Sequence, residues 1–162
     1  MKYLTSIFVL ALLSVSAAFS QDPNTRRFSV FKATTLSGTA EVITLQQPAS
    51  DGNFIRVEDV EVWCSVACDV TLERDGAAAT GTALTPIVQI TYGTSTTNAF
   101  HTSDAGVGTV ITMKTLPLNT IIPIVFNGGL YLAPTSTGSN FTVRTSAITG
   151  DVKITIVWRE RG

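Results

Sequence analysis

The segment VEVWCSVACDVTL, residues 60–72, decides how the rest of the chain is interpreted. Every second residue in it is apolar, which is the pattern of a β-strand with one face in a hydrophobic core. The apolar residues share one parity and are Val60, Val62, Cys64, Val66, Cys68, Val70 and Leu72. One continuous strand of this length would measure about 43 Å, whereas strands usually contain about five or six residues. The pattern therefore predicts β-structure and leaves open whether it is one strand or two.

The two cysteines favour two strands joined as a hairpin that turns at Ser65–Ala67. On one straight strand, cysteines four positions apart would lie about 13 Å from each other, but a disulfide needs Cα atoms within about 6.8 Å. In a hairpin, Cys64 faces Cys68 at a distance that allows an intramolecular disulfide. The same register creates three more cross-strand pairs on this face, namely Val62 with Val70, Val60 with Leu72, and Glu58 with Arg74.

The opposite face of this segment carries polar side chains and is the predicted solvent side. Trp63 lies on it, and an exposed tryptophan among polar residues is a candidate contact for a ligand or a partner. Two observations count against the hairpin. Asp59 would lie opposite Glu73, and the turn lacks the glycine or asparagine that such turns prefer. The hairpin is still preferred over the single strand, because it explains the cysteines.

The rest of the chain repeats short β-type runs separated by turn residues. The predicted strands are Phe28–Thr35, Ala40–Gln46, Phe54–Cys64, Cys68–Arg74, Pro86–Tyr92, Val107–Leu116, Thr120–Phe126, Leu130–Leu132, Phe141–Ser146 and Val152–Arg159. Polar Gly93–Gly106 and the featureless Ala77–Ala83 are expected to be connections, and further turns are expected at Asn127-Gly128-Gly129, as a hairpin, and at Thr149-Gly150-Asp151. Trp158 shares the parity of apolar neighbours and is expected in the core. We therefore expect an all-β chain forming one jelly-roll-like β-sandwich with about nine or ten antiparallel strands.

Length and charge exclude several classes of protein. The 162 residues allow one domain, expected at residues 21–162. Lys and Arg total 11 against 12 Asp and Glu, so the chain lacks the basic excess of a nucleic-acid-binding protein. Only 14% of residues are charged and 44% are apolar, which is the reverse of a disordered composition.

Residues 1–20 have the pattern of a secretory signal peptide. Lys2 supplies the positive charge, the apolar stretch Ile7–Phe19 is shorter than the roughly 20 residues of a membrane-spanning helix, and Ala18 and Ser20 fit the cleavage rule. We expect a mature protein that begins at Gln21, is secreted to the periplasm, cell surface or medium, and has no membrane anchor after cleavage. An uncleaved membrane anchor is the alternative.

Candidate catalytic groups are few. His101 is the one histidine of the sequence and no nucleophile motif accompanies it, so it cannot complete a zinc site or a catalytic triad with any recognisable partner. Glu58, Asp59 and Glu61 resemble a carboxylate cluster, but alternation places Asp59 and Glu61 on the solvent face, where charges are ordinary. We expect no enzyme activity, no metal and no cofactor.

The segment Arg26–Thr35 directly follows the expected cleavage site and is a candidate assembly strand. Its apolar contacts are Phe28, Val30, Phe31 and Ala33. Such a terminal strand either completes its own sandwich or pairs with the edge of a neighbouring copy, and exchange of that kind builds filaments.

Two blocks, residues 60–76 and 141–158, resemble small uncharacterised bacterial exported or phage-associated β-sandwich proteins. The resemblance implies a non-enzymatic β-sandwich. Three functions are consistent with these observations. The first is an exported structural or adhesive module of the cell surface that self-associates as an oligomer or filament. The others are a lectin-like module that binds a surface glycan, and a phage virion surface or decoration protein.

Overall fold

The computed structural model describes residues 25–47, 52–74, 82–84, 87–90, 95–102, 108–132 and 139–161, which form eleven strands. Among these residues no helix is long and apolar enough to cross a membrane. The strands are β1 (Thr25–Ser37), β2 (Val42–Gln47), β3 (Phe54–Cys64), β4 (Cys68–Arg74), β5 (Thr82–Ala83), β6 (Val88–Gln89), β7 (Asn98–Thr102), β8 (Thr109–Leu116), β9 (Thr120–Leu132), β10 (Ser139–Thr145) and β11 (Thr149–Arg161). The expected signal peptide, residues 1–20, lies outside the described residues.

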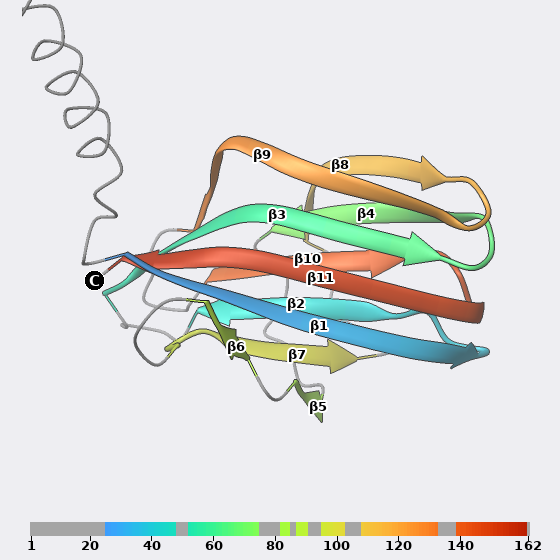
Figure 1. The fold of residues 1–162 in the computed structure, drawn as a ribbon, viewed down its shortest axis with the longest axis horizontal. Coiled ribbons are helices and arrows are strands. Elements are labelled where there is room, and N and C mark those ends of the chain that lie inside the picture. Colours follow the sequence, from blue (N-terminus) through green and yellow to red (C-terminus); the bar gives the residue numbers. More distant parts are fainter. Residues whose placement is uncertain are drawn as a thin grey trace, which may run out of the picture.

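The strands form two antiparallel sheets that pack face to face, so the predicted β-sandwich is confirmed (Figure 1). One sheet has the order β6-β1-β11-β3-β9 and the other β5-β7-β2-β10-β4-β8. The two sheets have matching strand orders, because β1, β11, β3 and β9 follow one another in the first sheet as β2, β10, β4 and β8 do in the second. Each of these strands therefore crosses to its chain neighbour in the opposite sheet, which is jelly-roll wrapping.

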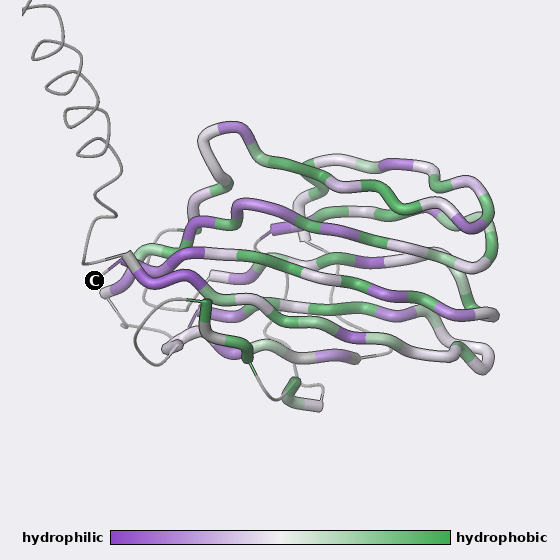
Figure 2. The backbone as a smooth tube through the Cα atoms, viewed as in Figure 1, coloured by the Kyte–Doolittle hydropathy of each residue, from purple (hydrophilic) through white to green (hydrophobic). Residues whose placement is uncertain are grey.

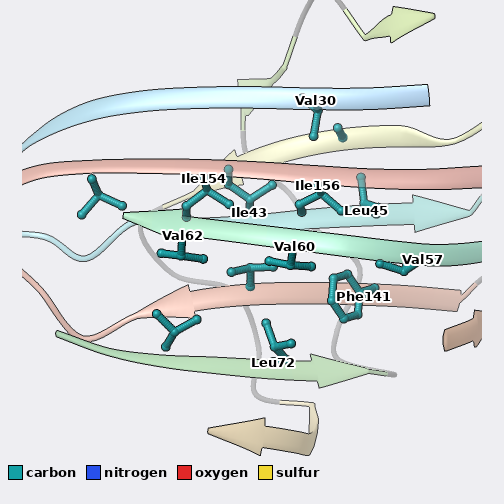
Figure 3. Close-up of a cluster of buried hydrophobic side chains, with 14 of the residues drawn as sticks. Val30, Ile43, Leu45, Val57, Val60, Val62, Leu72, Phe141, Ile154 and Ile156 are labelled. Carbon is teal, nitrogen blue, oxygen red and sulfur yellow. The ribbon is translucent and has the colours of Figure 1, made fainter. Parts of the chain in front are cut away.

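The hydrophobic core lies between the sheets (Figure 3). Alternate residues of the central strands point into it because successive side chains of a strand point to opposite faces. Trp158 is fully buried, as predicted, and its ring centroid lies 5.9 Å from that of Phe28. On the second sheet Phe141 is buried and meets the ring of Phe126 edge-on at 6.1 Å. The core therefore includes residues from both ends of the described chain.

The predicted disulfide is confirmed, but the hairpin around it is wrong. Cys64 and Cys68 are bonded, with Cα atoms 6.5 Å apart. Cys64 ends β3 in one sheet and Cys68 begins β4 in the other, so Ser65–Ala67 is a corner between sheets. The alternation of apolar residues in 60–72 is the same for a hairpin and for a corner, because in both cases the two strands face the same core. A corner also needs no turn glycine.

The pairs that the hairpin predicted are replaced by others. Asp59 does not face Glu73: it lies opposite Val157 and Val125 in the first sheet, while Glu73 forms an ion pair with Arg144 at 3.2 Å. Glu58 does not pair with Arg74. Its carboxylate instead binds Arg27 and Arg159 at 2.9 and 2.6 Å. The repulsion that counted against the hairpin therefore does not arise.

The hairpin predicted at Asn127-Gly128-Gly129 is also wrong. Thr120 to Leu132 is the single strand β9, and both segments pair with β3. Residues 126–129 lie opposite the single residue Glu58, which makes a large bulge. Gly128 and Gly129 have φ of 90° and 80°, so the glycines do supply the left-handed backbone that the prediction assumed. A Cβ on Gly129 would collide with the Arg56 side chain.

Three smaller expectations are corrected. Residues 93–106 were expected to be a connection, but Asn98–Thr102 pairs with β2 as β7. The turn expected at Thr149–Asp151 is the start of β11, and Gly150, with φ of 81°, pairs there with Leu36. Of the predicted strand Pro86–Tyr92, only Val88–Gln89 is a strand. Its residues 86, 91 and 92, and part of the expected 77–83 connection, lie outside the described residues.

A buried carboxylate holds the segment 95–97 against the end of β11. Glu160 is 2% exposed and accepts hydrogen bonds from Ser95 Oγ, Thr97 N and Trp158 Nε1 on one oxygen, and from Thr96 N and Oγ1 on the other. Burial by itself raises the pKa of Glu160, but the hydrogen bonds from Ser95, Thr97, Thr96 and Trp158 together hold that pKa below its ordinary value. The ionised carboxylate is therefore part of the folded structure.

Candidate interaction face

The outward side of β1, β11, β3 and β9 is a continuous surface, which we call the open face. Along each strand its residues alternate with buried residues such as Val30, Ile154 and Val62, so the open face points away from the core. Its central residues are Ser29, Phe31, Ala33, Asp59, Glu61, Trp63, Ile121, Pro123, Val125, Lys153, Thr155 and Val157. In Figure 2, β9 at the rim of this sheet is mostly apolar over its first half.

Strand register arranges these residues in rows across the sheet. The central row contains Phe31, Thr155, Glu61 and Pro123. The row on one side contains Ala33, Lys153, Trp63 and Ile121, and the row on the other contains Ser29, Val157, Asp59 and Val125. Apolar side chains and a few charges therefore share one surface built by four strands.

Three large apolar side chains on this face are more than half exposed. Phe31 is 58% exposed, Ile121 54% and Val125 62%. On the central strands of the other sheet the outward side chains are mostly polar, and Thr44, Glu73 and Thr142 among them are buried, whereas its edge strand β8 exposes Val110 and Met113. Exposed apolar patches on a folded domain commonly mark interaction sites. The open face is therefore the candidate functional surface.

Trp63 lies beside a shallow hollow in the open face. The hollow has a volume of about 160 Å³ and is lined by Phe31, Glu61, Trp63, Ile121, Lys153 and Thr155. The Lys153 ammonium lies 4.7 Å from the centre of the Trp63 ring. Pockets for drug-sized ligands usually measure about 300–1,000 Å³, so this hollow is too small to enclose one. It suits a flat contact or a single ring-sized group.

One end of the open face is basic. Arg27, Arg159 and Arg56 lie in one row, with Tyr131 at its rim. Glu58 binds two of these arginines, and the Arg56 guanidinium lies 5.8 Å from the centre of the Tyr131 ring. Two of the three arginines thus share one glutamate. At the other end, the outward residue of β11 is Asp151, which accepts a hydrogen bond from Thr35 at 2.6 Å.

The structure divides the candidate assembly strand between two faces. Phe28 and Val30 are 1% exposed and belong to the core, whereas Phe31 and Ala33 lie on the open face. The sequence grouped all four as apolar contacts, since their parity relative to the core was not fixed. Within this single chain, β1 pairs with β11 along its whole length. Exchange of β1 with a neighbouring copy stays a prediction.

Trp63 and Phe31, which the sequence named for separate reasons, lie on the same hollow. Sequence reasoning missed Ile121 and Lys153, because no local pattern reveals which residues of distant strands share a row. Period-2 alternation in Ile121, Pro123 and Val125 was visible, but alternate apolar residues occupy both faces of β9. The missing information was the register of β9 on β3.

Two of the sequence-predicted polar candidates, Glu58 and His101, have side-chain partners. Asp59 and Glu61 point away from the core, as predicted, and Glu58 is held by two arginines. His101 Nδ1 lies 3.4 Å from Oε1 of the buried Glu41. Within the part of the chain that the structure describes, no group of three or more His, Cys, Asp or Glu side chains could hold a metal ion.

The edges of both sheets carry features that discourage strand addition. Lys32 on β1 pairs with Ile154, in the part of β1 beyond Phe28 and Ser29, where β6 pairs with it. Lys114 on the edge strand β8 pairs with Val70, so both lysines lie on the core-facing side of their strands. Pro123 on the edge strand β9 lacks a backbone N–H, and this strand also has the bulge. Inward lysines, proline and bulges are recurrent protections of sheet edges. The open face has no such protection.

A scan against protein-family models finds no match, and a search of curated proteins finds no similar sequence. The resemblance of residues 60–76 and 141–158 to exported or phage-associated sandwich proteins therefore stays a prediction.

Proposed function

We propose that the protein is an exported, non-enzymatic structural module whose copies associate with one another through the open face. The observation that carries this proposal is the exposure of Phe31, Ile121 and Val125 together on one flat sheet surface. Burying apolar area stabilises association by about 25 cal/mol for each Å² removed from water. A second copy presents the same surface and can cover it.

The size of the open face sets the expected strength of this association. Four strands spaced about 4.8 Å apart, over eight residues of about 3.4 Å, give a footprint of about 500 Å². Two copies would bury about 1,000 Å² in total, which is the lower end of specific interfaces. Interfaces of less than about 1,200 Å² are typical of weak, transient complexes, so we expect a dimer that forms reversibly.

The experiment compares two lysine substitutions of equal exposure on edge strands of opposite sheets. Val125 on the open face is 62% exposed and Met113 on β8 is 61% exposed. Sedimentation velocity over a range of concentrations should show a dimer in the parent protein and in Met113→Lys. In Val125→Lys the dissociation constant should rise about tenfold or more, because a charge is placed in the apolar contact. A parent protein that stays monomeric at all concentrations, or equal effects of both substitutions, would rule out this function.

A lectin-like function is the second candidate, and the hollow beside Trp63 is the observation that favours it. Aromatic Trp63 and Phe31 adjoin the polar groups of Glu61, Lys153 and Thr155, which is the combination that holds a sugar ring by stacking and hydrogen bonds. Glycan-array binding that Trp63→Ala abolishes, measured at concentrations where the protein is monomeric, would favour this function. Binding that survives Trp63→Ala would place any glycan site elsewhere.

A further inference from the structure

We propose that two copies pair through their open faces about a two-fold axis that runs across the strands, along the row of Phe31, Thr155 and Glu61. This arrangement rests on the proposed self-association and specifies its geometry. It makes the assembly a closed dimer, because a contact in which both copies use the same surface leaves no surface free for a third copy.

The charges along β11 carry the inference. Its outward residues between 151 and 159 are, in order, Asp151, Lys153, Thr155, Val157 and Arg159, and Thr149 and Arg161 continue the series at the two ends. Asp151 and Arg159 lie at equal distances on either side of Thr155 and have opposite charges. A two-fold axis at Thr155 reverses the strand direction. It therefore places Arg159 of the first copy over Asp151 of the second, and Asp151 of the first copy over Arg159 of the second.

The charges on the neighbouring strands add to the basic end of the face. The end that contains Arg159 also contains Arg27 and Arg56, with Glu58 as the acid between them. The remaining rows have three acids and one base, namely Asp59, Glu61, Asp151 and Lys153. Reversing strand direction places the row of Arg27, Arg159 and Arg56 over the row of Thr35 and Asp151 of the other copy, which opposite charges favour. Asp59 then faces Trp63, and Lys153 faces Val157.

The alternative two-fold axis, parallel to the strands, is excluded by the same charges. About that axis, each row of one copy would lie over the same row of the other copy, and β1 of one copy would lie over β9 of the other. The row of Arg27, Arg159 and Arg56 would then face its own copy, with two glutamates to offset six arginines. Like charges in an interface that excludes water cost several-fold in affinity for each pair.

The proposed axis brings one pair of like charges together. Glu61 lies in the central row and meets its own copy, while Lys153 lies one row away and also contacts Trp63. Replacing Glu61 with glutamine removes this repulsion and keeps the size of the side chain. Glu61→Gln should therefore tighten the dimer several-fold.

Cysteine cross-linking tests the geometry at positions where small side chains replace small side chains. Ala33 and Ser29 lie on β1, one row to either side of Phe31. Across the proposed axis, Ala33 of one copy faces Ser29 of the other, whereas each lies about 14 Å along the strand from its own image. Sheets packed face to face are about 10 Å apart, so a short bis-maleimide can join facing positions only.

The expected result is a cross-linked dimer when Ala33→Cys and Ser29→Cys proteins are mixed, and little or none with either protein alone. Thr155→Cys alone should cross-link, because Thr155 lies on the axis. Ala33→Cys that cross-links to itself as well as in the mixture, or Thr155→Cys that does not cross-link within a dimer, overturns the geometry and leaves self-association intact. A protein that shows no dimer in sedimentation overturns both.

Discussion

Replacing Glu160 with glutamine tests whether one carboxylate anchors the segment 95–97. Glutamine keeps the shape of the side chain but exchanges an acceptor oxygen for an NH₂ donor. Ser95 Oγ, Thr97 N and Trp158 Nε1 can still donate hydrogen bonds to the remaining side-chain oxygen. Thr96 N, which donates to the second oxygen at 3.1 Å, then loses its acceptor. The substitution therefore leaves one backbone N–H without a partner and weakens the other bonds.

These losses set the expected magnitude. An unpaired buried N–H costs about 1–3 kcal/mol, and a hydrogen bond to a charged acceptor is about twice as strong as one to a neutral acceptor. The neutral glutamine recovers part of the cost of burying a charge. We expect Glu160→Gln to lower the free energy of unfolding by about 2–3 kcal/mol at pH 7.

Acidity provides a second measurement on the same residue. The pKa of Glu160 is lowered in the folded protein from its ordinary 4.5, so the folded state favours the ionised form. Its contribution to stability is therefore complete above about pH 4.5 and is lost as the pH falls through the lower folded pKa. The difference in unfolding free energy between the parent and Glu160→Gln should shrink over that acidic range.

Urea denaturation followed by tryptophan fluorescence measures both effects, at a protein concentration low enough for a monomer. Glu61→Gln is the matched control, because Glu61 is exposed on the same sheet and should change stability by no more than about 0.5 kcal/mol. A loss below about 1 kcal/mol for Glu160→Gln, or a difference that does not shrink in acid, would refute the anchoring role.

Three further changes probe the corner, the bulge and the first strand. Replacing Cys64 and Cys68 with alanine should cost about 2 kcal/mol, read by urea denaturation, because the disulfide closes only a small loop; no loss would mean that the corner needs no cross-link. Gly129→Ala should be less stable than Gly128→Ala by about 1 kcal/mol in thermal unfolding, since both have positive φ but only Gly129 is packed against Arg56; equal losses would contradict that contact. Deleting residues 21–35 uncovers β11, and a peptide of residues 26–35 should restore the folded fluorescence spectrum if β1 can be supplied by another molecule; absence of peptide binding would contradict strand exchange.

Local sequence determined the strands that flank the disulfide. Phe54–Cys64 and Cys68–Arg74 have the predicted bounds, because period-2 alternation and flanking turn residues are properties of the segment itself. The same alternation could not show that these strands belong to different sheets. Val62 and Val70 face the core in a hairpin and also in a sandwich corner, so burial in the structure is the same for both topologies.

The glycines near residue 128 illustrate a second limit. The positive φ of Gly128 and Gly129 agrees with the left-handed backbone that a hairpin turn requires. A bulge requires the same backbone, and only the pairing of Leu130 and Val125 with β3 distinguishes the two. β7 was missed for a related reason: its five residues, Asn98–Thr102, form a strand by pairing with β2 and contain no run of β-branched residues.

The candidate face depended on register, and its interpretation depends on comparing it with the sheet edges. Lys32 and Lys114 lie on the core-facing side of their strands, and Pro123 on β9 lacks a backbone N–H, so these strands resist the addition of another strand. Phe31 and Val125 remain exposed on the flat side of the same sheet. A chain selected only to stay monomeric would gain from polar residues at these positions as well as at the edges. Association of two sheets face to face requires an accessible face and does not require accessible edges. The combination seen here therefore favours a closed dimer over a filament built by strand addition.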